Sequence, residues 1–196
     1  MEDEIQEPAL KYNYVSPEEY LAAERTAKEK HELHEGHIVT MTGASVEHND
    51  IVSNLIGSIN PFLKGKSCRV FPSDLRTYIP TAESFTYPDV SIVCDKLNLK
   101  DDEYKDTLLN PSVIIEVLSP STQKYDKGNK FFYYIQIATL KEYILIDSVA
   151  CYVQTARKQA DGSWKFEETT DTNTSLHIQT INHSIPLQEI YDRVKF

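Results

Sequence analysis

The sequence predicts a single α/β domain, and three observations lead to this fold class. The chain has 196 residues, which is enough for one substantial hydrophobic core but would be crowded as two domains. Apolar residues at helical spacing alternate along it with short apolar runs bounded by turn residues. No internal repeat, low-complexity tract or linker divides it. Residues 1–13 are polar and are expected to form a flexible arm, so the domain should span residues 14–196.

A helix is expected to open the domain, and a β-hairpin should follow it. Ser16 is a capping residue, Pro17 suits the first helical position, and Glu19 completes a capping pattern three residues after the serine. This helix should run from Pro17 to about Lys30. Its core-facing side chains are expected to be Tyr20, Leu21 and Ala27. Residues 31–42 fit the hairpin, which is the first of two extra hairpins expected near the ends of the chain.

A second helix and three strands are predicted next. Ser45 can cap the helix, whose apolar residues recur at helical spacing and so form one inward face. These residues are Ile51, Val52, Leu55, Ile56, Ile59 and Phe62. The strand-like runs cover residues 68–79, 87–94 and 112–118. The charged segment 95–110 should lie outside the core as a loop or a short helix.

The C-terminal part is predicted to contain one more helix and two hairpins. The helix should cover about residues 127–138, with Asp126 as its N-cap. Residues 185–190 should close the chain as a short capping element. The hairpins are expected to pair residues 142–146 with 151–156 and residues 164–168 with 175–178.

Composition and charge limit the possible function classes. No stretch approaches the roughly 20 apolar residues that span a bilayer, and the acidic start of the chain does not resemble a signal peptide. The net charge of −10 argues against broad, nonspecific binding of nucleic acid, because lysines and arginines supply most of that affinity. Bound divalent metals or a local cleft would have to offset this charge.

The three cysteines indicate a cytoplasmic protein. They are odd in number and far apart, and no CxxC pair occurs. We expect them to be small buried residues in a reducing cytosol, forming neither a disulfide framework nor a zinc site. They are Cys68, Cys94 and Cys151.

Two carboxylates stand out because each lies in an apolar strand. Glu116 interrupts the apolar run 113–118, where a charge is costly unless it is paired or bound to metal. Asp89 follows Pro88 at the start of another apolar run. Taken singly, Glu116 could be a paired edge residue and Asp89 a turn residue. If the strands are adjacent, both carboxylates could bind one Mg²⁺ ion, which takes one or two protein carboxylates and completes its shell with water and phosphate oxygens.

Lys130, on the helix after the Glu116 strand, is the candidate cation for stabilising negative charge at phosphorus. The alternative is a solvated salt bridge with Asp126, four residues earlier on the helix. Lys124 and Lys127 are nearby candidates for the same role.

The order of these motifs resembles the Uma-type restriction endonuclease family of the PD-(D/E)XK nuclease superfamily. The resemblance covers roughly residues 14–157. It is carried by residues 20–21, 32–36, 45–48, 54–55, 68–74, 87–90 and 115–122, and then by Asp126, Lys130, Tyr134 and residues 142–147. It implies a restriction-endonuclease-like fold, in which helices flank a mixed central sheet, together with Mg²⁺ or Mn²⁺ and phosphodiester hydrolysis.

The resemblance matches Asp89 and Glu116 to the two acidic positions of the superfamily. The superfamily lysine would stand two residues after Glu116, where this chain has Leu118, so the lysine role passes to Lys130 on the following helix. His48 on the second helix could approach the metal or the attacking water, or it could be a surface histidine. Asp74 could be a further metal ligand, or it could pair with Arg69 or Arg76. Tyr134, one turn after Lys130, is expected to be a packing residue.

The sequence therefore predicts a metal-dependent endonuclease that acts on DNA, as a homodimer because cleavage of a duplex needs two sites. Two alternatives remain open at this point. One is a nuclease-like domain that has lost activity and serves binding or regulation, which the acidic charge and Leu118 favour. The other is a metal-dependent hydrolase of a small phosphoester.

Overall fold

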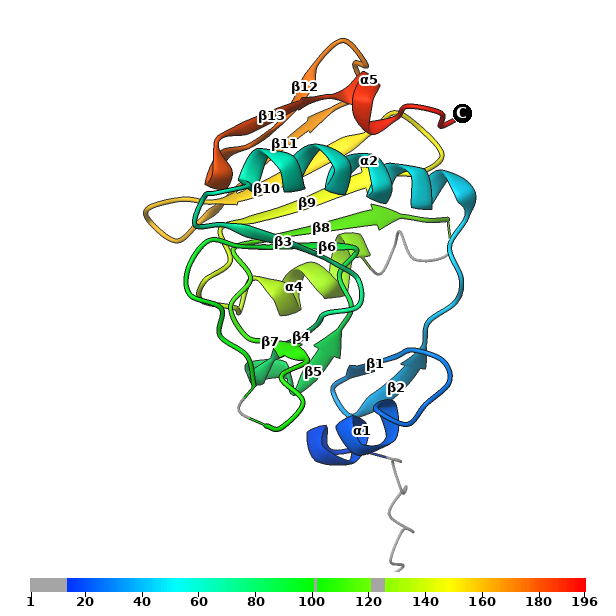
Figure 1. The fold of residues 1–196 in the computed structure, drawn as a ribbon, viewed down its shortest axis with the longest axis vertical. Coiled ribbons are helices and arrows are strands. Elements are labelled where there is room, and N and C mark those ends of the chain that lie inside the picture. Colours follow the sequence, from blue (N-terminus) through cyan, green and yellow to red (C-terminus); the bar gives the residue numbers. More distant parts are fainter. Residues whose placement is uncertain (1–13, 101, 121–125) are drawn as a thin grey trace, which may run out of the picture.

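The main sheet of the protein has six strands in the order β11-β10-β9-β8-β6-β3 (Figure 1). The structure is a computed structural model and describes residues 14–100, 102–120 and 126–196. The strands are β3 (Arg69–Pro72), β6 (Val90–Val93), β8 (Val113–Leu118), β9 (Glu142–Asp147), β10 (Val153–Lys158) and β11 (Trp164–Thr169). β8 and β9 are parallel, and all other neighbours are antiparallel. The predicted mixed central sheet is confirmed.

A second sheet lies below the first in Figure 1 and has the strand order β2-β1-β5-β4-β7. Its strands are β1 (His31–His34), β2 (His37–Thr40), β4 (Arg76–Ile79), β5 (Ser84–Thr86) and β7 (Thr107–Leu108). Helix α1 (Pro17–Glu24) packs on this sheet through a small apolar cluster. The predicted strand 68–79 is therefore two strands in different sheets, because residues 73–75 turn the chain from β3 into β4.

Helices cover both faces of the main sheet. Helix α2 (Val46–Leu63) and the C-terminal unit pack on one face. That unit consists of β12 (Ser175–Ile178), η3 (Gln179–Ile181), β13 (His183–Pro186) and α5 (Leu187–Ile190). The other face is covered by the wide turn η2 (Asp126–Lys130) with α4 (Phe131–Tyr134), and by the short η1 (Pro80–Ala82) beside β4. Alternate residues of β8 thus point into two different cores.

The predicted starts of the first two helices are confirmed, but the start of the third and several helix extents are wrong. Ser16 and Glu19 form the expected capping box, and the Ser45 side chain accepts a hydrogen bond at the start of α2. Helix α1 ends at Glu24, however, so Ala27 is exposed. The predicted helix 127–138 is the η2 turn followed by a short α4, and Asp126 is the first residue of the turn instead of an N-cap.

Two predictions of strand pairing also need correction. β12 pairs with β13, whereas β11 joins β10 in the main sheet, so the predicted pairing of 164–168 with 175–178 is wrong. The segment 95–110 also contributes β7, whose two residues are buried because they pair with β4. The hairpin expected near the N-terminal end is present as β1–β2, and the one near the C-terminal end is present with a different partner strand, as β12–β13.

The cysteine prediction is wrong: none of the three residues is fully buried, and two of them form a disulfide. Cys68 and Cys94 flank the paired strands β3 and β6, and their sulfur atoms form a disulfide. The cause is the register of this strand pair, which brings two residues 26 positions apart side by side. Cys151 is a free thiol. No described helix is both long and apolar enough to cross a membrane.

Candidate active site

Asp89 and Glu116 lie together because their strands are neighbours. β6 and β8 are antiparallel with Val90 opposite Ile115, so the next residues outward, Asp89 and Glu116, face each other. The backbone N–H of Asp89 lies 3.4 Å from Oε2 of Glu116, and the N–H of Val117 donates to Oδ2 of Asp89 at 2.7 Å. The Glu116 side chain is only 4% exposed and that of Asp89 is 17% exposed. The predicted adjacency of the two carboxylates is present in the structure.

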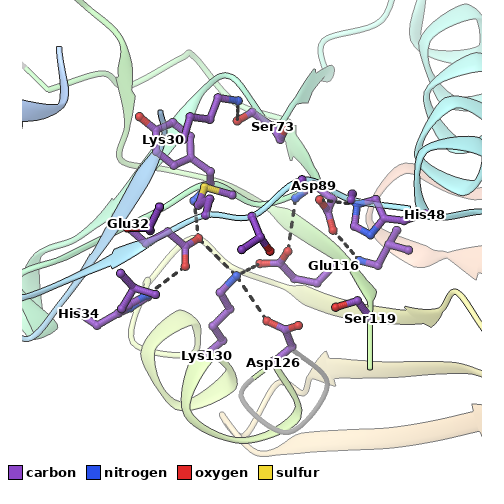
Figure 2. Close-up of a pocket in the computed structure, with 18 of the residues that line it drawn as sticks. Lys30, Glu32, His34, His48, Ser73, Asp89, Glu116, Ser119, Asp126 and Lys130 are labelled. Atoms are coloured by element: carbon purple, nitrogen blue, oxygen red, sulfur yellow. Dashed lines mark hydrogen bonds and ion pairs between the residues drawn. The ribbon is translucent and has the colours of Figure 1, made fainter. Parts of the chain in front are cut away.

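Lys130 points between carboxylates from three different parts of the chain (Figure 2). Its Nζ lies 3.2 Å from Oε1 of Glu116, 3.3 Å from Oε1 of Glu32 and 3.4 Å from Oδ1 of Asp126. All four side chains are less than 10% exposed. The Asp126–Lys130 pair is therefore buried in the site, and the predicted alternative of a solvated helix salt bridge is wrong.

Two further side chains touch the carboxylate pair. The Tyr134 hydroxyl donates to Oε1 of Glu116 at 2.8 Å, so it is more than the packing residue that we expected. Nε2 of His48 lies 3.1 Å from Oδ1 of Asp89. His48 reaches this position because it lies in the first turn of α2, which Ser45 caps. The structure thus brings His48, Asp89, Glu116 and Lys130 together.

The pKa values reflect a buried and crowded set of charges. Burial raises the pKa of Glu116 to about 8, and Asp89 and Asp126 push it in the same direction while Lys130 opposes them. Burial would lower the pKa of Lys130, but Glu116 and Glu32 outweigh this effect and hold it well above its ordinary value. Glu32 is also buried, yet Lys130 and His34 lower its pKa to about 2. Burial opposes the charged form of His48, but Asp89 raises its pKa.

The site lines a cavity of about 1040 Å³ between the β1–β2 hairpin, the start of α2 and the η2–α4 segment. The described lining residues include six carboxylates, two lysines and three histidines. Its walls are therefore acidic, which matches the charge of the whole chain. A phosphate substrate would need additional positive charge in this cavity.

The carboxylate pair fits a cation of the Mg²⁺ type. Glu32, Glu116 and Asp126 surround Lys130, and Asp89 lies beside Glu116, so the carboxyl groups of the site outnumber its one ammonium. Among the described residues, no three or more Asp, Glu, His or Cys side chains form a ready-made metal cluster, because Lys130 occupies the space between three of the acids. Mg²⁺ needs only one or two protein carboxylates, however, and Asp89 and Glu116 provide that number.

The structure does not bring Asp74 to this site. Its side chain is 84% exposed and pairs with Lys30, because the turn after β3 carries it to the surface. We therefore leave Asp74 out of the candidate metal ligands. Of the other candidate cations, Lys127 lies over the ring of Tyr152, and Lys124 lies outside the described residues.

Glu32 and Asp126 are members of the site that we did not predict. Glu32 lies on β1 of the second sheet, and only the motif order of the family resemblance included it. Asp126 was expected to be a helix cap or a partner of Lys130, and the motif order of the family resemblance also included it. Strand alternation does not distinguish a buried ionic glutamate from an exposed one, so local pattern alone carried no signal for Glu32.

Comparisons with known proteins bear on the family and the fold of the chain. Residues 17–188 match the model of a family described as "Uma2: Putative restriction endonuclease". The chain belongs to this family. Two proteins of Synechocystis sp. (strain ATCC 27184 / PCC 6803 / Kazusa), both described as uncharacterized, are similar to it. The first, slr1290, is 33% identical over 96% of this chain and 97% of its own length. The second, sll1609, is 35% identical over 81% of this chain and 89% of its own.

A solved structure supports the fold of this Uma2 family member. It is the crystal structure of "a putative nuclease belonging to DUF820" from Anabaena variabilis. The two structures superpose with a TM-score of 0.77 over 92% of this chain and 99% of the other, at 18% sequence identity. The restriction-endonuclease-like fold class is thus confirmed, and the family supports a nuclease type of function.

Proposed function

We propose that this protein is a metal-dependent endonuclease that hydrolyses phosphodiester bonds of DNA. The observation that carries the proposal is the position of Asp89 and Glu116, opposite each other on paired strands and facing a cavity that also contains Lys130. Asp89 and Glu116 would hold one Mg²⁺ or Mn²⁺ ion through their carboxylates. When bound, such an ion polarises the phosphate and lowers the pKa of the attacking water.

The protein's own residues have distinct roles in this proposal. In hydrolysis the water loses a proton and its oxygen bonds to phosphorus, while the bond from phosphorus to one sugar oxygen breaks and that oxygen takes up a proton. Lys130 would exchange one carboxylate partner for a phosphate oxygen and stabilise the charge that develops there. His48 would hold Asp89 in place through the 3.1 Å contact and approach the attacking water.

The proposal includes the substrate, the cellular compartment and the oligomeric state. The substrate is DNA and the protein is cytoplasmic, where DNA is accessible. It acts as a homodimer, because cutting both strands of a duplex requires two sites. The Cys68–Cys94 disulfide is unusual in a reducing compartment, so labelling of thiols in fresh cell extract tests this location directly.

Metal titration by calorimetry, combined with plasmid nicking, tests the proposal. The wild type is expected to bind Mg²⁺ or Mn²⁺ and to convert supercoiled plasmid to nicked and linear forms. Asp89→Ala and Glu116→Ala should lose both properties while remaining folded. A folded wild-type protein that binds no divalent ion would refute the proposal.

The acidic cavity supports one alternative function, the hydrolysis of a small phosphoester. Its volume is in the range of small-molecule sites, and carboxylates outnumber lysines among the described lining residues. These features favour a small phosphoester over a long nucleic acid. Metal binding with hydrolysis of small phosphodiesters and no plasmid nicking would support this alternative. Metal binding with no hydrolysis of either substrate would support an inactive binding domain.

A further inference from the structure

We infer that Glu32, on the N-terminal hairpin, is a positioning residue that shares the Lys130 ammonium with Glu116 and so leaves Glu116 able to bind a divalent cation. This inference rests on the proposed function, because it assumes that Asp89 and Glu116 form the metal site. It assigns part of that site to the second sheet, outside the strands that carry the two metal-binding acids.

The Lys130 ammonium lies between three carboxylates. This ammonium has three protons, and it lies at similar distances from Glu116, Glu32 and Asp126, between 3.2 and 3.4 Å. Among the described residues, these three carboxylates attract the ammonium, and its position reflects the balance between them. If one carboxylate loses its charge, the ammonium should shift toward the other two.

Glu32 is anchored by contacts that do not involve Lys130. The backbone N–H of Tyr87 donates to Oε1 of Glu32 at 2.9 Å, and Nε2 of His34 lies 2.9 Å from its Oε2. Its strand β1 is hydrogen-bonded on both sides, to β2 and to β5. Glu32 can therefore attract Lys130 without moving toward it.

The Lys130 ammonium and a metal ion would compete for the carboxylate of Glu116. Oε1 of Glu116 accepts from Lys130 and Tyr134, whereas Oε2 faces the backbone of Asp89. An ammonium drawn closer to Glu116 competes with a metal ion for the same negative charge. Glu32 reduces this competition by sharing the ammonium, and it also adds a negative charge that attracts the metal. When the charge of Glu32 is removed, both effects are lost and metal binding should weaken.

A matched pair of variants tests the inference. Glu32→Gln removes the charge and keeps the side-chain size. Glu24→Gln is the control, because Glu24 is likewise a buried carboxylate of the N-terminal region, hydrogen-bonded to His31 and to the Tyr87 hydroxyl. Calorimetric titration with Mn²⁺ is expected to show at least tenfold weaker binding for Glu32→Gln. Glu24→Gln should bind within about twofold of the wild type, even if its melting temperature falls.

Three results would separate the possible outcomes. Wild-type affinity in folded Glu32→Gln, or an equal loss in both variants, would overturn the inference and leave the proposed function intact. Absence of Mn²⁺ binding by the wild type would overturn the proposed function and the inference with it. If Glu32→Gln does not fold, Glu32→Asp replaces it. Glu32→Asp keeps the charge but shortens its reach, so an affinity between wild type and tenfold loss supports the role, whereas unchanged affinity overturns it.

Discussion

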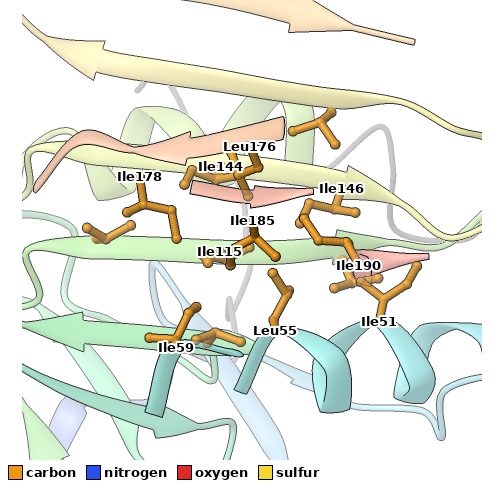
Figure 3. Close-up of a cluster of buried hydrophobic side chains, with 14 of the residues drawn as sticks. Ile51, Leu55, Ile59, Ile115, Ile144, Ile146, Leu176, Ile178, Ile185 and Ile190 are labelled. Atoms are coloured by element: carbon orange, nitrogen blue, oxygen red, sulfur yellow. The ribbon is translucent and has the colours of Figure 1, made fainter. Parts of the chain in front are cut away.

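The two faces of strand β8 present opposite environments. On one face Ile115 points into an apolar cluster with residues of α2 and the C-terminal unit, as Figure 3 shows. On the other face Glu116 points into a group of charged side chains around Lys130 (Figure 2). Both side chains are almost fully buried. Strand alternation alone separates them, so one strand contributes to the core and to the site.

The difference shows which kind of burial stabilises the fold and which serves function. Apolar burial on the Ile115 face is favourable by itself. Burial of charge on the Glu116 face is costly and is tolerated only because the groups compensate one another. A change on the first face should therefore act on stability alone. A change on the second should depend on pH and on divalent metal.

Loss of the Lys130 charge is expected to have the largest effect on stability. Lys130→Met leaves three buried carboxylates without their shared ammonium, which should cost about 3–5 kcal/mol in free energy of unfolding. Urea denaturation at pH 7 measures the loss. The loss should shrink at acidic pH, where the acids can bind protons. Lys127→Met, which alters an exposed lysine on the same turn, should change stability by less than about 0.5 kcal/mol.

The apolar face is tested by Ile115→Ala. Truncation leaves a cavity in the cluster of Figure 3 and should cost about 2–5 kcal/mol. The same urea experiment measures it, at pH 5 and at pH 8. Because no charge is involved, the loss should be equal at both values, and Mn²⁺ affinity of the folded protein should not change. A loss that varies with pH would mean that the two faces are coupled.

Glu116→Gln tests the pH dependence of the polar face. Since the pKa of folded Glu116 is about 8, above the ordinary carboxyl value, the folded state holds a proton that the unfolded state releases. This contribution to stability is present below about pH 4.5 and is lost as pH rises toward 8. Without metal, the wild type should therefore be about 3–4 kcal/mol less stable at pH 8 than at pH 5. The variant should show little of this difference, and an equal difference in both proteins would contradict the prediction.

Tyr134→Phe is expected to have the smallest effect. It removes the hydroxyl that donates to Glu116, at a cost of about 1–2 kcal/mol. Tyr143→Phe is the matched control, because its buried hydroxyl donates to the backbone oxygen of Asp126. Both variants should lose similar stability in thermal melts. Only Tyr134→Phe should alter Mn²⁺ affinity, and a change of affinity in both would assign the effect to packing.

Local chemistry explains which elements were predictable from the sequence. The Ser16 and Ser45 caps depend on contacts within one turn, so their residue types alone indicated the helix starts. The run 113–118 is apolar on both sides of Glu116, which indicated a strand covered on both faces. Because the neighbouring run holds Asp89 at its start, the pairing of the two acids followed once the strands were taken as adjacent.

The parts that were not predictable depend on contacts between distant segments. The switch from β3 to β4 needs β5 and β7 as partners, and nothing within residues 68–79 encodes them. Glu32 joins the site across 98 positions of sequence, through Lys130. Asp74 is of a residue type that binds metal ions, but the turn that carries it faces outward. In all three cases, contacts between distant segments determine where the residues lie.

The Cys68–Cys94 disulfide closes a covalent ring around the chain segment that leaves the main sheet and returns to it. The ring contains β3, β4, β5 and β6, and therefore Asp89. A protease that cuts once inside the ring cannot release a fragment until the disulfide is reduced. On a non-reducing gel such a nicked protein should migrate as one species, with the strands on both sides of the cut still joined.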